Sequence, residues 1–258
     1  MVILVHGALS DLRSWSAQMS VLSSKYRVVS YSRRYHEPNS VPAGEIDYTH
    51  RQHVDDLTRL IETLGSGPAH LVGHSYGATV AALVAMERPE LVNRLILAEP
   101  SLFSMLSNNL DKVSLRFHAV ALNVLQKLSE NGEQSLAVRE YLNIVVGKNV
   151  YDELPAKDRL VINQNAHTLG PMLRTYFAPT NLDPSVASKM TAPTLLITGE
   201  LSPRLYQAVV RELHNCLPVA ESFTLPGASH GLHMENGEDF SVAVMEFLSK
   251  TKGLGKNN

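Results

Sequence analysis

Short apolar runs of high β propensity alternate with longer segments of helical spacing along most of the chain. The runs are apolar almost continuously, as expected for strands that are covered on both faces. This alternation predicts an α/β fold with a mostly parallel, doubly wound sheet of about six strands. The expected strands are residues 2–5, 27–31, 70–72, 94–98, 194–198 and 222–225. The expected helices are residues 12–24, 49–64, 76–87, 203–217 and 237–250.

Residues 101–190 depart from this alternation, because they have helical spacing and no convincing strand. A crossover between neighbouring strands needs far fewer residues. Open α/β sheets bind ligands at the carboxyl ends of their strands, so we predict that residues 101–190 are a helical cap over that edge. The core is then residues 1–100 and 191–251, followed by a flexible tail at 252–258. The alternative is a set of helices packed on one edge, with no role at the site.

The run Gly73-His74-Ser75-Tyr76-Gly77 lies between an expected strand and a helix rich in small residues. The two glycines allow a tight backbone bend and a close approach of helix and strand. Such a turn exposes the Ser75 hydroxyl above the sheet, next to a helix N-terminus with free N–H groups. The run therefore predicts the nucleophile of a serine hydrolase. The alternative is an ordinary glycine-rich turn.

On this run, and on His6-Gly7 and His230, the sequence resembles the α/β-hydrolase superfamily over almost the whole chain, least in the predicted cap. Many members have a β-hairpin before the His-Gly strand, whereas this chain begins on that strand. The resemblance implies a cofactor-free mechanism with an acyl-enzyme intermediate. Dehalogenase and epoxide hydrolase activities are disfavoured, because those relatives carry an aspartate where Ser75 stands.

Acyl transfer also needs donors for the negative charge that develops on the substrate carbonyl oxygen. We expect one backbone N–H from Tyr76, the residue after the nucleophile. By resemblance to the family's His-Gly-x motif, Ala8 supplies the second N–H, with Leu9 as the alternative. We expect His6 to hold this loop through hydrogen bonds rather than to act in catalysis.

A serine hydroxyl needs a base, and His230 lies directly after the last expected strand, where the superfamily places its base. The other histidines fit this role less well. His74 is on the elbow and is expected to point away from the substrate, and His233 is expected to pack at a helix start. His118 and His167 lie in the predicted cap and are candidates for substrate contact.

The acid of the triad is not at the position most members use, which is occupied here by Ser202. Glu99 follows the expected strand at 94–98, and some lactonases and dehalogenases carry a triad glutamate at this point. Glu200, two residues before Ser202, is the alternative acid. We favour Glu99, although a buried glutamate paired with some other donor would give the same pattern. The predicted triad is Ser75, His230 and Glu99.

Composition and charge limit the partners. The net charge is −2 and no basic stripe is present, so neither a nucleic acid nor an anionic membrane is expected. No apolar stretch reaches membrane-spanning length, and the single cysteine, Cys216, suits a cytoplasmic protein. No metal-ligand spacing, phosphate loop or dinucleotide fingerprint occurs, so no metal or cofactor is expected. Arg33 and Arg34 are expected to brace a loop through salt bridges rather than to contact substrate.

These features predict a carboxylic ester or lactone hydrolase that acts on a small molecule as a monomer or homodimer. The predicted cap is rich in Leu, Val, Phe, Met and Tyr, which indicates an apolar acyl or aryl group in the substrate. Fold alone does not fix the chemistry. A carbon–carbon bond hydrolase or thioesterase on the same triad, and a slow-turnover small-molecule receptor, are the alternatives.

Overall fold

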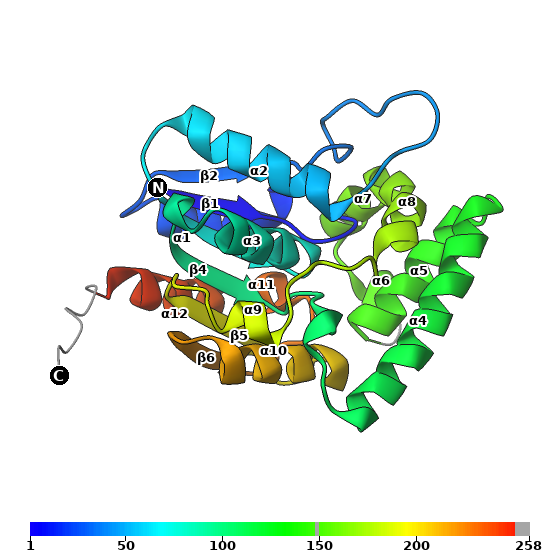
Figure 1. Cartoon of the computed structure of the whole chain (residues 1–258). Helices are drawn as coiled ribbons and strands as arrows, with labels where there is room; N and C mark the ends of the chain where they lie inside the picture. The colour runs from blue at the N-terminus through cyan, green and yellow to red at the C-terminus, as the bar shows by residue number, and fades with distance from the viewer. Residues whose placement is uncertain (148–149, 251–258) are drawn as a thin grey trace.

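The computed structural model describes residues 1–147 and 150–250. Its centre is a six-stranded sheet in which every neighbouring pair is parallel, with strand order β2-β1-β3-β4-β5-β6 (Figure 1). The predicted α/β fold class is confirmed. The strands are β1 (Val2–Val5), β2 (Val28–Tyr31), β3 (Ala69–His74), β4 (Val92–Ala98), β5 (Thr194–Gly199) and β6 (Ala220–Leu225).

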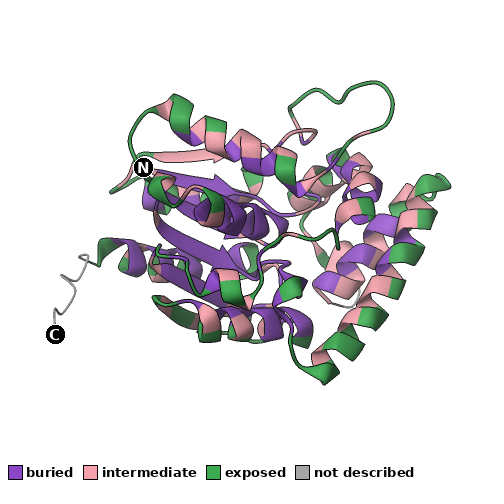
Figure 2. Ribbon diagram, viewed as in Figure 1, coloured by how far each residue is buried: buried purple, intermediate pink, exposed green. Residues whose placement is uncertain are grey.

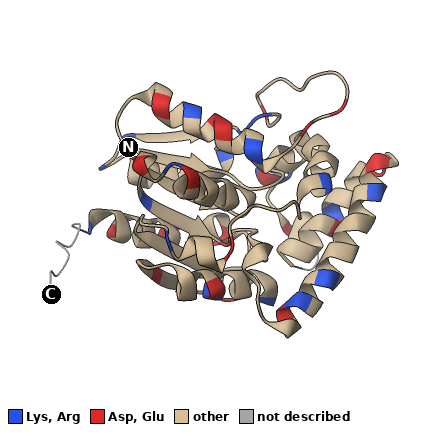
Figure 3. Ribbon diagram, viewed as in Figure 1, with Lys and Arg blue, Asp and Glu red and all other residues tan. Residues whose placement is uncertain are grey.

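Helices cover both faces of the sheet, because successive residues of each central strand point to opposite sides. Ile3 and Val5 of β1 pack with α2 (His50–Leu64), α3 (Tyr76–Glu87) and α10 (Arg204–Cys216). Val2 and Leu4 face the other layer, which contains α1 (Ser16–Leu22) and α12 (Gly237–Ser249). The central strands are buried and the outer helix faces are exposed (Figure 2). Charges of both signs are interspersed along α2 and α4 (Figure 3).

The segment between β4 and β5 lies beyond the carboxyl ends of the strands, and its described residues form helices and connecting turns without a strand (Figure 1). We call residues 101–190 the cap. Its long helix α4 packs on α5 and α8. The α-helices of the cap are α4 (Asn109–Glu130), α5 (Gln134–Val145), α6 (Val150–Glu153), α7 (Ala156–Gln164), α8 (Leu169–Thr175) and α9 (Pro184–Ala187). Its 3-10 turns are η3 (Phe103–Met105) and η4 (Ala166–Thr168).

The remaining elements are the short turns η1 (Leu12–Trp15) and η2 (Pro89–Leu91), and the short helix α11 (Leu232–Glu235). The helix expected at 12–24 is therefore divided into η1 and α1 and ends at Leu22. Asp11 starts η1 as its N-cap, accepting the N–H of Arg13. The expected tail at 252–258 lies outside the described residues. No described helix is long and apolar enough to cross a membrane.

Helix α3 approaches β1 so closely that only glycine fits at position 77. A Cβ atom on Gly77 would lie 2.3 Å from the carbonyl oxygens of both Val5 and His6. These are backbone atoms of the central sheet and its first loop, so they cannot move aside as the end of a side chain could. This contact sets the distance between the helix that begins at Tyr76 and the strand that ends at Val5.

We predict that Gly77→Ala lowers the free energy of unfolding by about 3 kcal/mol, through overpacking against backbone. Urea unfolding followed by circular dichroism measures this. The matched control is Gly67→Ala, because Gly67 has φ +73° and open space around it, so only left-handed strain of about 1 kcal/mol is added. Equal losses in the two variants would contradict the proposed close contact.

Candidate active site

Ser75 stands at the sharp turn between β3 and α3. Its φ of 51° is unusual for a residue other than glycine, and such strain is typical of functional positions. The turn is held in place because the Ser75 N–H donates to the carbonyl of Ala98, 2.8 Å away on the neighbouring strand. The Ser75 hydroxyl is therefore presented at the carboxyl edge of the sheet, directly before the first turn of α3.

His230 lies in the loop between β6 and α11, and its Nε2 is 3.0 Å from Ser75 Oγ. Two neighbours hold His230 in place, one through its backbone and one through its ring. His74 Nε2–H donates to the carbonyl of His230 at 2.7 Å, which fixes the backbone. The ring of Tyr206 on α10 stacks on the imidazole with 4.0 Å between centroids and 26° between planes. The imidazole is thus held in one orientation by the protein itself.

Glu99 completes the hydrogen-bond chain. Its Oε2 lies 2.6 Å from His230 Nδ1, and its side chain is fully buried. The parallel register explains this placement. His74 lies opposite Ala98, so the next residues, Ser75 and Glu99, leave adjacent strands side by side. Because a carboxylate accepts from Nδ1–H, the lone pair of Nε2 is directed at the Ser75 hydroxyl, as a general base requires.

The second oxygen of Glu99, Oε1, accepts from Thr198 Oγ1–H at 2.6 Å and from the Gly199 N–H at 2.9 Å. Burial of Glu99 raises its pKa, but the hydrogen bond and charge of His230 and the hydrogen bond from Thr198 outweigh this effect and leave the pKa below its usual value. Glu99 is therefore ionised at neutral pH. Ser202, at the position where most members carry the acid, is buried, and its hydroxyl oxygen forms no hydrogen bond with the described residues.

Glu200, the alternative acid, is not in this chain of contacts. Its Oε2 accepts the N–H of Gly227 at 2.8 Å and so holds the turn that follows β6. The residue is exposed to solvent, whereas Glu99 and His230 are buried. The structure therefore brings Glu99, and not Glu200, to the histidine.

The loop after β1 lies beside Ser75. His6 Nδ1–H donates to the carbonyl of Gly7 at 2.9 Å, and His6 Nε2 accepts the N–H of Arg33 at 2.9 Å, so His6 holds the loop as expected. The N–H groups of Ala8 and Tyr76 donate to no other described residue. Ala8 lines the same cavity as Ser75. Leu9, the alternative donor, is buried with φ 52°.

A cavity of about 480 Å³ opens on Ser75 between core and cap. Ala8, Leu9, His74 and His230 form its core side, and a few polar residues of η1, α7 and α11 reach its rim. The cap side is aliphatic except for Tyr141 and the charged residues Lys157 and Asp158. The aliphatic residues are Leu142, Val145, Val146, Val150, Leu154, Leu160, Val161 and Ile162. The cavity therefore suits a ligand with an alkyl portion.

Hydrogen bonds fasten the cap to the core beside this cavity. Asn165 Nδ2–H donates to Asp11 Oδ2 at 2.8 Å in a buried contact, and Asn165 Oδ1 accepts the N–H of Glu37. His167 Nε2–H donates to the carbonyl of Tyr35 at 2.8 Å. The sequence carried no signal for the pairing of Asp11 with Asn165, because 153 residues separate the two side chains along the chain.

The remaining candidate histidines have other surroundings. His118 lies among Phe103, Phe177 and Tyr206, where burial lowers its pKa to about 4. His233 packs against Trp15 at the start of α11, with the two rings tilted by 35°. Neither His118 nor His167 lines the cavity, so the expectation that they contact substrate has no support in the geometry. The contribution of Tyr206 at the base was not foreseen, because stacking across the fold leaves no mark in the sequence.

A model of the alpha/beta hydrolase fold family matches residues 1–237. The chain belongs to the α/β-hydrolase family. Mouse sn-1-specific diacylglycerol lipase ABHD11 is 25% identical, with 96% of this chain and 80% of the lipase covered. Epoxide hydrolase 3 of Xenopus tropicalis is 26% identical over 97% of this chain and 71% of its own length.

Solved structures agree on the fold. The enol-lactonase from Burkholderia xenovorans LB400 has a TM-score of 0.79 at 21% identity, covering 96% of this chain and 91% of the lactonase. MenH from S. aureus has a TM-score of 0.77 at 20% identity, covering 96% of this chain and 92% of that one. At these identities the likeness concerns the fold alone. Membership of this family shows that the protein is a hydrolase. Because members of the family catalyse different reactions, the type of bond that this protein cleaves must be argued from its site.

We predict that Glu99→Gln lowers turnover about 10⁴-fold with the fold intact, because an amide can neither hold the required tautomer of His230 nor stabilise its cation. Steady-state hydrolysis of an activated ester measures this, and circular dichroism checks the fold. The matched control is Glu200→Gln, which is expected to stay within about twofold of wild type. The reverse ranking would assign the acid to Glu200.

A second prediction concerns acid stability. Burial and the charge of Arg33 lower the pKa values of His6, His36, His50 and His53, that of His50 to about 4. Below pH 6.5 the unfolded chain binds protons that the folded protein does not, so the free energy of unfolding must fall as the pH falls. Each such histidine contributes up to about 1.4 kcal/mol per pH unit. Urea unfolding at pH 7.0 and 5.5 measures the loss, and equal stability at the two values would show that these histidines are protonated in the fold.

Proposed function

We propose that this hydrolase cleaves a carboxylic ester or a lactone through an acyl-enzyme intermediate. The observation that carries the proposal is the continuous hydrogen-bond chain from Glu99 through His230 to Ser75, which ends in an apolar cavity. A serine nucleophile, a neutral imidazole base and a buried carboxylate are the groups that acyl transfer uses.

In the proposed mechanism Ser75 Oγ attacks the substrate carbonyl carbon while its proton passes to His230 Nε2. The N–H groups of Ala8 and Tyr76 stabilise the oxyanion, aided by the N-terminus of α3. The protonated His230 then donates to the leaving alkoxide, and the acyl group stays on Ser75. Water, deprotonated by His230, attacks this ester, and the proton returns to Ser75 as the acid departs.

The surroundings of His230 favour the charge that it must carry during these steps. Glu99 is ionised, fully buried and 2.6 Å from Nδ1, so it stabilises the imidazolium with little screening by solvent. The Tyr206 ring face stacked on the imidazole adds a cation–π contribution of about 0.5–2 kcal/mol when the ring is protonated. Both interactions strengthen between the ground state and the transition state, which is the condition for acceleration.

The cavity indicates an alkyl rather than an aryl group in the substrate. Its cap side is mostly aliphatic, and the phenylalanines of the cap, such as Phe103 and Phe177, pack elsewhere. Each buried methylene adds about 0.8 kcal/mol of binding energy. The lipase relative and the enol-lactonase neighbour fit an ester or lactone substrate. A lactone is the preferred subclass because Glu99 occupies a position used by some lactonases. A cytoplasmic location and a monomeric or homodimeric state stay predictions from the sequence.

We predict multiple turnovers on p-nitrophenyl alkanoates, with kcat/KM rising from acetate to octanoate and with no activity in Ser75→Ala. The gain reflects alkyl burial in the cavity and is expected to reach about tenfold for every two methylenes buried. Stopped-flow and steady-state absorbance measure it, with γ- and δ-lactones tested alongside. A single slow turnover would instead indicate a receptor, and activity retained in Ser75→Ala would refute the mechanism.

A further inference from the structure

Arg33 follows β2 and is buried behind the loop after β1, where no ion pair with a carboxylate is formed among the described residues. The expectation that both arginines brace a loop through salt bridges is therefore wrong for this one. Arg34 does pair with Asp56, at 2.5 and 2.6 Å. Burying a cation without a counter-ion costs free energy of folding. Stability alone therefore does not explain why an arginine occupies this position.

The guanidinium of Arg33 binds backbone carbonyls of the loop after β1, which carries the proposed oxyanion donor Ala8. Nη2–H donates to the carbonyl of Gly7 at 2.8 Å, and Nε–H donates to the carbonyl of His6 at 3.0 Å. The third nitrogen, Nη1, donates to Tyr48 Oη at 2.7 Å. Because the guanidinium is planar and its donors form a rigid fork, these contacts fix the direction of both peptide groups.

The carbonyl of Gly7 belongs to the same peptide unit as the N–H of Ala8. The peptide is planar and trans, so a donor bound to the carbonyl oxygen fixes the direction of the N–H on the opposite side. Gly7 receives two donors, Arg33 Nη2–H and His6 Nδ1–H, one of which is charged. Hydrogen bonds to a carbonyl polarise its peptide and strengthen the N–H as a donor.

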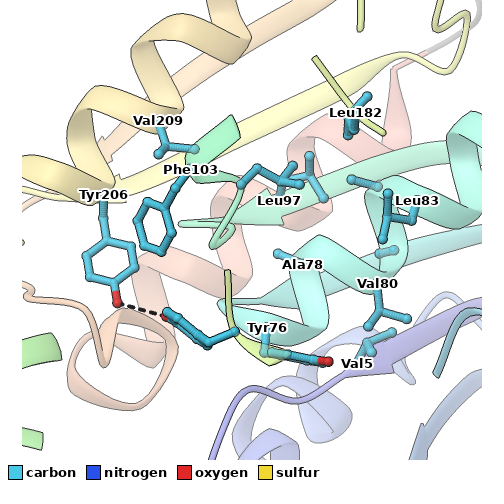
Figure 4. Packing of buried hydrophobic residues seen from close by; sticks show 14 of the residues in the cluster. Val5, Tyr76, Ala78, Val80, Leu83, Leu97, Phe103, Leu182, Tyr206 and Val209 are labelled. Atoms are coloured by element: carbon cyan, nitrogen blue, oxygen red, sulfur yellow. Dashed lines mark hydrogen bonds between the residues drawn. The ribbon is translucent and has the colours of Figure 1, made fainter. Parts of the chain in front are cut away.

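Arg33 also touches the other half of the oxyanion hole. Its guanidinium carbon lies 4.8 Å from the ring centroid of Tyr76, whose backbone N–H is the second donor. Figure 4 shows Tyr76 at the start of α3, in the same apolar cluster as Val5 and Val80. One cation therefore contacts the loop that carries Ala8 and the side chain of the residue that supplies the other N–H.

We propose that Arg33 is a positioning residue for catalysis. It orients and polarises the Gly7–Ala8 peptide so that the Ala8 N–H points toward Ser75, and it holds Tyr76 in place through contact with the Tyr76 ring. This inference rests on the proposed function, because the hole is needed only where an oxyanion forms. It also predicts that Ala8, and not Leu9, is the donor, because the peptide before Leu9 accepts nothing from Arg33. The charge of Arg33 acts from a buried position, where solvent screens it weakly.

The test measures the rate at which a fluorophosphonate phosphonylates Ser75, because the phosphoryl oxygen of this probe occupies the same oxyanion hole. The rate is compared between wild type and the variants Arg33→Met, Arg33→Lys and Arg34→Met. Ser75 Oγ bonds to phosphorus, fluoride leaves, and His230 takes the hydroxyl proton. We expect a 10- to 100-fold slower reaction in Arg33→Met, less than the about 10²–10³ for complete loss of a donor. Arg34→Met, with its ion pair at the surface of the loop, is expected to react at the wild-type rate.

Arg33→Lys keeps the charge but cannot bind two carbonyls at once, so its rate is expected to fall between Arg33→Met and wild type. Rates are measured well below each variant's thermal midpoint, since a purely structural role would move the midpoint without slowing the folded protein. A wild-type rate in folded Arg33→Met would overturn the inference. If Arg33→Met does not fold, a wild-type rate in Arg33→Lys would overturn it instead. A wild-type protein that is phosphonylated but hydrolyses no ester would refute the proposed function alone, because the relative rates still decide the role of Arg33.

Discussion

The hydrogen bond between Glu99 and His230 is the interaction on which the rest of the site depends. It joins the end of β4 to the loop after β6, and it fixes the imidazole so that Nε2 faces Ser75. The bond exists because β3 and β4 run parallel in a register that releases Ser75 and Glu99 at the same edge. Both residues have positive φ values, of 51° and 47°, so the backbone bears strain to present them.

Much of the fold follows from local patterns. Continuous apolar runs predicted all six strands, and the ends of α3 are those expected from the Ser75 turn and Pro89. Boundaries were less exact where tertiary pairing extends a strand, as in β4, which begins two residues earlier because Val92 pairs with Ala69. Strand order and the division of η1 from α1 depend on contacts between distant residues, which no local pattern contains.

The site shows the same division between local and distant information. The positions of Ser75 and His230 follow from a motif and from a loop after a strand, and the contact between Glu99 and His230 has the geometry expected for the triad. Three contacts could not be predicted: the hydrogen bond between Asp11 and Asn165, the stacking of Tyr206 on His230, and the hydrogen bonds from Arg33 to backbone carbonyls. Each depends on the approach of side chains from separate elements. Arg33 in particular reads as an ordinary loop arginine until its surroundings are known.

Burial links these features to each other. Glu99, His230 and Arg33 are all buried, so the charges of Glu99 and Arg33 act with little screening by solvent. The central claim is that Ser75 becomes covalently acylated. The most direct measurement is peptide mass spectrometry of the protein quenched by acid during hydrolysis of p-nitrophenyl octanoate. The account predicts an octanoyl group on the peptide that contains Ser75, accumulating in His230→Ala only to a small extent. Hydrolysis without any acyl group on that peptide would contradict it.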